Sequence, residues 1–77
     1  MSKKLLIDVR GAGEYETKHK EGAINIPVQD LDNSSFVQEL NKDTQIQVYC
    51  HSGGRAEMAK MILEFRGFTN VENIGGM

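Results

Sequence analysis

The sequence predicts a single α/β domain, built as a small doubly wound parallel sheet of about four strands with helices on both faces. Its 77 residues suffice for one domain and no more. Short apolar runs typical of buried strands alternate along the chain with segments of helical periodicity. Such alternation favours parallel strands joined by right-handed helical crossovers. We therefore expect the strands in the spatial order second, first, third, fourth, within one domain spanning residues 1–77.

The first half of the chain holds two of the expected strands. Residues 4–9, KLLIDV, are too few for a helix and fit a buried strand. Residues 12–20 follow as a short helix that Gly22 ends. Residues 23–27, AINIP, are expected to form the second strand. Pro27 closes it, because proline cannot donate a hydrogen bond to a strand ladder.

The middle of the chain adds a second helix and the third strand. Within residues 30–42, Ser34 or Ser35 can cap a helix. Residues 45–50, QIQVYC, then show the alternation of a strand. The side chains expected on one face of this strand are those of Ile46, Val48 and Cys50.

Residues 55–67 carry the clearest helical pattern of the chain. Apolar side chains recur there at the spacing of one helix face, which we expect to pack on the core. Gly67 stands where helices commonly end in a left-handed residue, and Phe68 can pack back on the last turn. A fourth strand is expected over residues 70–74. The expected core stripe consists of Met58, Met61, Ile62 and Phe65, widened by Ala59 and Leu63.

The charge balance and residue inventory argue against several classes of protein. Lys and Arg number 9 and Asp and Glu 11, a net charge of −2, without the basic run or aromatic platform of a nucleic-acid-binding protein. A single cysteine and two histidines, His19 and His51, argue against a disulfide framework and against a metal site. The apolar run of residues 5–7 is too short for a signal peptide or membrane span. We expect a cytoplasmic protein, with a periplasmic location as the alternative for a processed mature chain.

The predicted topology directs attention to Cys50, the only cysteine. Ligands in open α/β sheets bind outside the carboxyl ends of the strands, at the point where the strand order reverses. Here that point lies between the first and third strands. Cys50 ends the third strand, and Asp8 and Arg10 lie at the end of the first. We therefore expect the functional site between these two strand ends.

The loop of residues 50–55 has the features of an anion-binding cradle. It joins a strand directly to a helix, so its backbone N–H groups and the positive end of the helix dipole converge on a small space. Gly53 and Gly54 can adopt positive φ and let the loop curl. Arg55 adds a fixed positive charge. Together these features favour the thiolate of Cys50 over the thiol.

Simpler interpretations of the same residues stay open at this point. An unpaired cysteine is often a small buried hydrophobe. His51 fits an exposed loop residue, and Ser52 fits a helix cap. Asp8 and Arg10 fit a local ion pair worth little to stability.

Four segments in order resemble the rhodanese-like, or sulfurtransferase, domain family: LLIDVR, EGAINIP, VYCHSGGRA and GFTNVENIGG. The resemblance runs from about residue 5 to residue 76 and is to the short, single-domain type of that family. Many members carry an extra strand before the first segment and more helix after the last. Neither is found here, so we expect either a minimal natural form or a trimmed one, with one sheet face or edge less covered, which favours some self-association.

The resemblance implies a sulfurtransferase that moves a sulfane sulfur from thiosulfate or a similar donor to a thiophilic acceptor. Cys50 would be the nucleophile and would carry the sulfur as a persulfide. The acceptor would be cyanide in an assay and a thiol or dithiol in cells, with a thioredoxin-like protein as a candidate. No metal, organic cofactor, nucleic acid or membrane is implied.

The resemblance also assigns roles to the neighbours of Cys50. Asp8 and Arg10 correspond to the family's strand-end pair and would support the site. Arg55, helped by His51, would attract the anionic donor. The substrate-binding cradle would consist of His51, Ser52, Gly53, Gly54 and Arg55.

Two other functions fit the same residues. One is a non-catalytic module that uses the fold to bind a partner or to sense redox state. The other is a small cysteine-dependent phosphatase or an arsenate reductase. Related phosphatases carry one more residue between the cysteine and the arginine, whereas four residues separate Cys50 from Arg55. The tighter loop suits a sulfane sulfur better than a phosphoryl group, so we rank sulfur transfer first.

Overall fold

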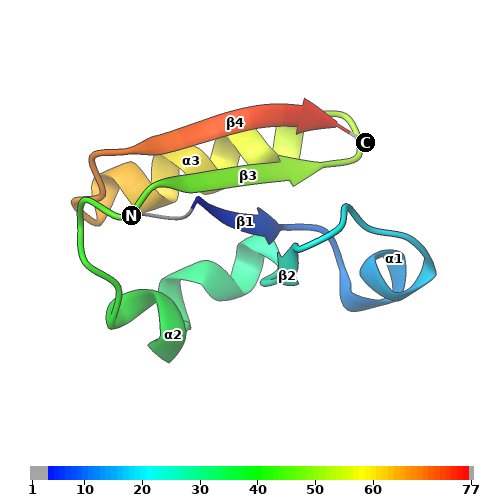
Figure 1. Cartoon of the computed structure of the whole chain (residues 1–77), viewed down its shortest axis with the longest axis horizontal. Helices are drawn as coiled ribbons and strands as arrows, with labels where there is room; N and C mark the ends of the chain where they lie inside the picture. The colour runs from blue at the N-terminus through cyan, green and yellow to red at the C-terminus, as the bar shows by residue number, and fades with distance from the viewer. Residues whose placement is uncertain (1–3, 77) are drawn as a thin grey trace.

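The computed structural model of the protein describes residues 4–76 and confirms the predicted α/β fold (Figure 1). In this part of the chain, four parallel strands form one sheet in the order β2-β1-β3-β4, as expected. The strands are Leu5–Asp8 (β1), Ile24–Asn25 (β2), Ile46–Cys50 (β3) and Val71–Gly76 (β4). The helical segments are Ala12–Thr17 (α1), the 3₁₀ segment Val28–Asn33 (η1), Ser35–Gln38 (α2) and Gly54–Phe65 (α3).

The differences from the predicted elements lie mainly at their ends. α1 stops at Thr17 instead of reaching residue 20, and β2 is only two residues long. Of the two predicted caps of α2, Ser34 is the one used, because its Oγ accepts the Val37 N–H at 3.2 Å.

β4 runs two residues further than predicted, through both of the glycines that follow Ile74. Gly76 pairs with Cys50, beyond an irregularity in the ladder between β3 and β4. A side chain at Gly76 would collide with the backbone carbonyl of His51. The end of β4 therefore passes so close to the loop after β3 that only glycine fits there.

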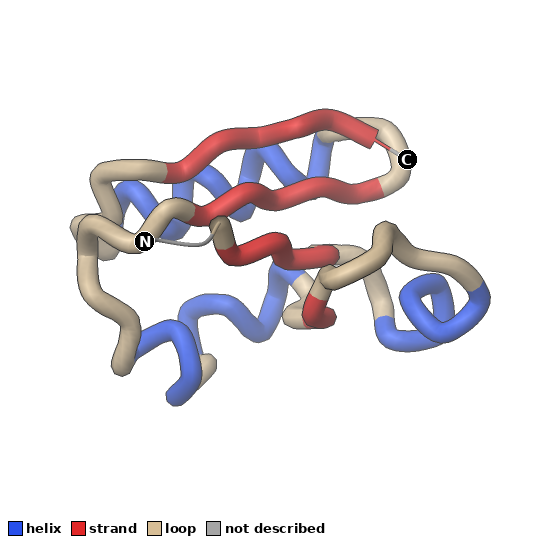
Figure 2. Tube along the Cα trace, viewed as in Figure 1, coloured by secondary structure: helices blue, strands red, loops and turns tan. Residues whose placement is uncertain are grey.

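The hydrophobic core lies between one face of the sheet and the segments α3, η1 and α2. α3 runs along β3 and β4 and also contacts η1 (Figure 2). Successive side chains of a strand point to opposite faces, so every second residue of β1 and β3 faces these helical segments. The buried core residues are Ile7, Val9, Leu31, Val37, Ile46, Val48, Cys50, Ala56, Ala59, Leu63 and Phe68.

The opposite face of the sheet is covered mainly at its carboxyl end, by the segment that follows α1. The Lys20 N–H donates to the Tyr49 hydroxyl there. Toward the amino ends of the strands this face is less covered: Leu6 and Gln47 are partly exposed and Glu72 is exposed. Within residues 4–76, no helix is long and apolar enough to cross a membrane.

The predicted core stripe of α3 is wrong for three of its residues. Met58, Met61 and Phe65 are 57%, 62% and 90% exposed. Only Ile62 of the main stripe packs partly against the core. The exposed side chains instead line an open groove on the outer side of α3.

α3 buries Ala56, Ala59 and Leu63, which recur at the i, i+3, i+7 spacing of one helix face. Two small alanines allow the helix backbone to approach the sheet closely. The rotation of the helix is also constrained at its start, because the Ala56 N–H points at the sulfur of Cys50. Large side chains on the other face of α3 therefore cannot reach the core.

The C-terminus of α3 forms as predicted. Gly67 adopts the left-handed conformation with φ of +101°. The Gly67 N–H donates to the Glu64 carbonyl, and the Phe68 N–H donates to the Leu63 carbonyl. This pair of hydrogen bonds is the Schellman motif, and it brings the buried Phe68 ring back to the core.

The orientation of α3 predicts unequal costs for two alanine substitutions. Leu63→Ala should lower the free energy of unfolding by about 2–5 kcal/mol, because it leaves a cavity under α3. Phe65→Ala, two residues away on the exposed face, should change it by no more than about 0.5 kcal/mol. Urea unfolding followed by circular dichroism measures both. Equal costs would contradict the observed rotation of α3.

Candidate active site

The sulfur of Cys50 lies at the carboxyl end of β3, beneath the loop that leads into α3. Cys50 is only 1% exposed, so it does belong to the core, as the simpler interpretation has it. Its Sγ nevertheless accepts hydrogen bonds from the Gly53 N–H at 2.9 Å and the Ala56 N–H at 3.4 Å. Gly53 has φ of +96°, the left-handed conformation that lets the loop curl over the sulfur.

These contacts change the acidity of the thiol. Burial raises the pKa of Cys50, but the backbone N–H groups of Ala56, Gly53, Ser52 and Arg55 lower it by more in total. The net effect is a pKa below the ordinary value of a cysteine. The backbone N–H groups of the loop and of the first turn of α3 thus converge on the Cys50 sulfur, the geometry that an anion cradle requires.

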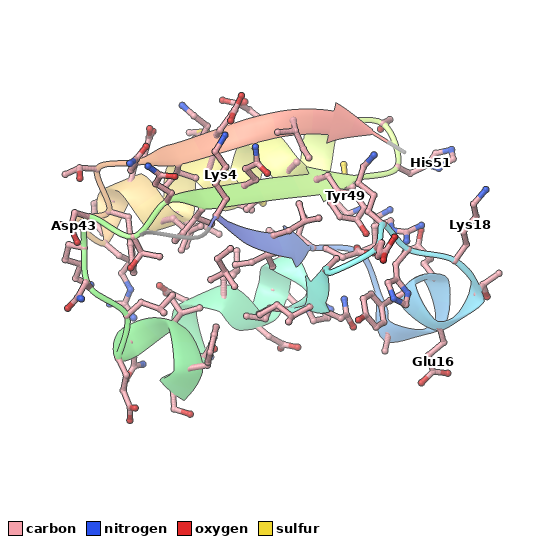
Figure 3. All side chains as sticks on the ribbon, viewed as in Figure 1. Lys4, Glu16, Lys18, Asp43, Tyr49 and His51 are labelled. Atoms are coloured by element: carbon pink, nitrogen blue, oxygen red, sulfur yellow. The ribbon has the colours of Figure 1, made fainter. Side chains whose placement is uncertain are left out.

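The side chains of the loop lie mostly outside this cradle. His51 and Ser52 are exposed, and Figure 3 shows His51 pointing outward beyond the end of the sheet. Ser52 does not cap α3, because the N-cap position is Gly53 and no side chain bonds there. Gly54 and Arg55 are exposed in the first turn of α3.

The guanidinium of Arg55 is engaged by a residue that the sequence does not single out. Its Nη1 lies 2.9 Å from Oε1 of Glu14, and its Nη2 lies 3.1 Å from Oε2. Arg55, then the Gly11 N–H, lower the pKa of Glu14 to about 2. This bidentate pair joins α1 to the Cys50 loop across 41 positions of sequence.

Asp8 and Arg10 do form a local ion pair, as in the simpler interpretation, but the pair is buried and belongs to a larger hydrogen-bond network. Asp8 is 0% and Arg10 6% exposed. The Asp8 carboxylate accepts the Arg10 backbone N–H at 2.9 Å, the Arg10 Nη2 at 2.8 Å and the Tyr49 hydroxyl at 2.9 Å. Burial alone would raise the pKa of Asp8, but these hydrogen bonds keep it below its ordinary value.

Tyr49 extends the network to the segment after α1. Its hydroxyl accepts the Lys20 N–H at 2.9 Å, while the Nη2 of Arg10 donates to the carbonyl of Lys18. The side chain of Tyr49 is fully buried, and this burial raises its pKa. Sequence reasoning missed Tyr49, Glu14 and Ala56, whose backbone N–H donates to the Cys50 sulfur. Because side chains alternate along β3, Tyr49 points to the other face of the sheet from Cys50. No local sequence feature indicates its hydrogen-bond partners.

The structure thus brings Cys50, the loop backbone and Arg55 together, and it places the Asp8 and Arg10 network directly beside them. The hydrogen bonds from Arg55 to Glu14 raise the pKa of Arg55 most, and the charge of Cys50 raises it further, whereas burial and the charge of Arg10 lower it. Within residues 4–76, no cluster of three or more His, Cys, Asp or Glu side chains could hold a metal ion. The arrangement can stabilise negative charge on one sulfur atom.

Comparison with known proteins agrees with this geometry. Residues 1–77 match the family model of the rhodanese-like domain. The thiosulfate sulfurtransferase PspE of Escherichia coli (strain K12) is 39% identical over 71 residues, which are 92% of this chain and 68% of that protein. YrkF of Bacillus subtilis (strain 168), named as a candidate sulfur carrier protein, is 38% identical over 69 residues, which are 90% of this chain but only 36% of that protein. A solved structure of a rhodanese with anions from E. coli has a TM-score of 0.88 and 38% identity, covering 96% of this chain and 87% of that one.

The hydrogen bonds to Cys50 predict an acidic thiol. We expect the thiolate absorbance in the ultraviolet, taken as the difference from Cys50→Ser, to rise with a midpoint below the reference of about 8.5. The same chain unfolded in guanidinium chloride should titrate near that reference. Because the folded pKa is the lower one, the thiolate stabilises the fold fully above the unfolded pKa, and this stabilisation is lost as pH falls through the folded pKa. Equal midpoints for folded and unfolded protein would contradict the role of the cradle.

Proposed function

The chain belongs to the rhodanese-like domain family, and on that premise we propose that it is a sulfurtransferase that carries sulfane sulfur as a persulfide of Cys50. The single observation that carries the proposal is the cradle of backbone N–H groups around the Cys50 sulfur. It favours a negative charge on sulfur at the carboxyl end of β3, where a nucleophile in this type of sheet meets its ligand.

In the first half-reaction, the Cys50 thiolate attacks the outer sulfur of a donor such as thiosulfate. A bond forms between Sγ and that sulfur, the S–S bond of thiosulfate breaks, and its electron pair leaves with sulfite. A thiolate and a dianion thereby give a persulfide anion and a dianion, so the charge balances without a proton transfer. The N–H groups of Gly53 and Ala56 stabilise the negative sulfur during this step.

In the second half-reaction, the thiolate of an acceptor attacks the outer sulfur of the persulfide. The Cys50 Sγ leaves with the electron pair of the breaking S–S bond, and the acceptor becomes the persulfide. A thiol of lowered pKa is a better leaving group in such exchange, so the same N–H groups assist both halves.

We assign the remaining residues by their position. The loop residues His51, Ser52, Gly53 and Gly54 shape the cradle mainly through their backbone, and Arg55 supplies the charge at its edge. Asp8 and Arg10 hold the neighbouring strand end and do not contact the sulfur. Because the chain has one cysteine, the acceptor is an external thiol or dithiol, and a thioredoxin-like protein fits that description.

The proposal predicts a covalent intermediate. After incubation with thiosulfate, intact-protein mass spectrometry should show a gain of one sulfur atom on the wild-type chain. Cyanide should remove that sulfur and release thiocyanate in equal amount. The reaction should be repeated with an organic persulfide and with polysulfide to compare donors.

The matched control is Cys50→Ser, which replaces one atom and should give neither the adduct nor thiocyanate. If the wild type forms no adduct with any of the three donors, the sulfurtransferase proposal fails. The fold would then serve as a binding or redox-sensing module, which a partner retained by Cys50→Ser would support.

A further inference from the structure

We propose that Glu14 sets the donor specificity of the site: by pairing with Arg55, it favours sulfur donors of low charge, such as organic persulfides, over doubly charged thiosulfate. Glu14 acts through Arg55 and is therefore a positioning residue. The inference rests on the proposed sulfur transfer and adds to it the class of donor that the site fits.

The first argument is the geometry of the ion pair. The guanidinium of an arginine binds an anion best through two parallel N–H groups, one to each of two oxygens. In Arg55 the terminal nitrogens Nη1 and Nη2 already make these contacts, to Oε1 and Oε2 of Glu14 at 2.9 and 3.1 Å. Two oxygens of a donor that approaches this end of the guanidinium would have to displace the carboxylate, and a donor that approaches from the Nε side meets a charge that Glu14 already pairs.

The second argument is that the other arginine beside the site is paired as well. Arg10 is buried and forms an ion pair with Asp8, with its Nη2 2.8 Å from Oδ2. The two cation–carboxylate pairs leave neither guanidinium without a counter-charge. The Lys20 ammonium lies over the ring of Tyr49, 5.5 Å from its centroid. Lys18 and His51 lie further out, and Figure 3 shows both extending toward solvent.

The third argument concerns where the remaining positive potential lies. It comes from the N–H groups of Gly53 and Ala56, which converge on one sulfur atom at the start of α3. That arrangement stabilises a single negative sulfur, and offers nothing comparable to the second charge on the sulfonate end of thiosulfate. A donor with less charge beyond its terminal sulfur therefore loses less solvation on entering.

Two donors isolate the effect of charge. Thiosulfate and methanethiosulfonate both transfer a terminal sulfur to a thiolate, with sulfite and methanesulfinate as the respective leaving groups. They differ by one negative charge, because a methyl group replaces one oxygen. Turnover with each, using cyanide as the acceptor, gives kcat and KM separately.

The test variant is Glu14→Gln, which removes the charge and keeps an oxygen that can accept the Gly11 N–H, a bond that Glu14 makes at 3.1 Å. We expect kcat/KM for thiosulfate to rise about fivefold through a lower KM, because an unscreened guanidinium attracts the dianion. For methanethiosulfonate the rise should stay below about twofold. The control is Glu16→Gln on the same helix, whose side chain points away from the loop (Figure 3); it should leave both donors unchanged.

Two further measurements test whether Glu14 acts through the charge of Arg55. In an Arg55→Gln background, Glu14→Gln should only relieve the repulsion between the unpaired carboxylate and thiosulfate, so kcat/KM should stay below that of the Glu14→Gln single variant, because no guanidinium remains to attract the dianion. The wild type should show a weak dependence of kcat/KM for thiosulfate on ionic strength, and Glu14→Gln a steeper one.

Several outcomes would overturn the inference. A higher KM for thiosulfate in Glu14→Gln would mean that Glu14 holds Arg55 in a productive position. Equal changes for both donors would show that charge is not what Glu14 controls. A steep salt dependence in the wild type would show that Glu14 does not neutralise Arg55. None of these resembles failure of the sulfurtransferase proposal itself, in which the wild type forms no persulfide with either donor.

Discussion

The carboxylate of Asp8 links the end of β1 to the end of β3 and, through its partners, to the segment after α1. It sits at the end of β1 with no exposed surface and accepts hydrogen bonds from Arg10 and from Tyr49 at the end of β3. Through these partners it fixes the segment after α1, where the Lys20 N–H donates to Tyr49. Removing one member of a buried ion pair costs about 3–5 kcal/mol, as much as a domain this small can have in total.

The position of α1 is one consequence of this network. α1 has no buried residue of its own, so packing alone does not fix it. Two sets of contacts hold α1: the Asp8 network binds the segment that follows it, and the ion pair between Glu14 and Arg55 joins it to α3. The buried carboxylate thus determines where Glu14 stands, and Glu14 in turn determines how much charge Arg55 presents. The buried Asp8 network and the charge of Arg55 are therefore coupled through the position of α1.

The architecture and the position of the nucleophile follow from the sequence, because they depend on local signals. Apolar runs, turn residues and helical spacing give the strand order β2-β1-β3-β4 and place Cys50 at the switch point. The orientation of α3 does not follow. That helix carries two apolar faces, and hydropathy favours the larger one, with Met58 and Phe65, over the face of Ala56 and Leu63 that packs.

The contacts that tune the site are also invisible in a single sequence. Glu14 and Arg55 are 41 positions apart, as are Asp8 and Tyr49, and neither pair has a local signature. The glycine at position 76 reads as a turn residue, yet it is required by the passage of β4 beside the backbone of His51. Tertiary proximity, and not residue type, gives these positions their roles.

The near-complete burial of Cys50 has a steric consequence for its chemistry. With 1% of the residue exposed, no bulky group can approach the sulfur from the side. A reaction partner has to present its electrophilic sulfur as a terminal atom, with nothing attached beyond it. Thiosulfate, persulfides and polysulfides share that shape, whereas a disulfide between two large groups lacks it. In the proposed persulfide, the outer sulfur would lie about 2 Å beyond Sγ, because that is the length of a bond between two sulfur atoms. The transferred sulfur of the proposed intermediate would therefore be more accessible to an acceptor than Sγ itself.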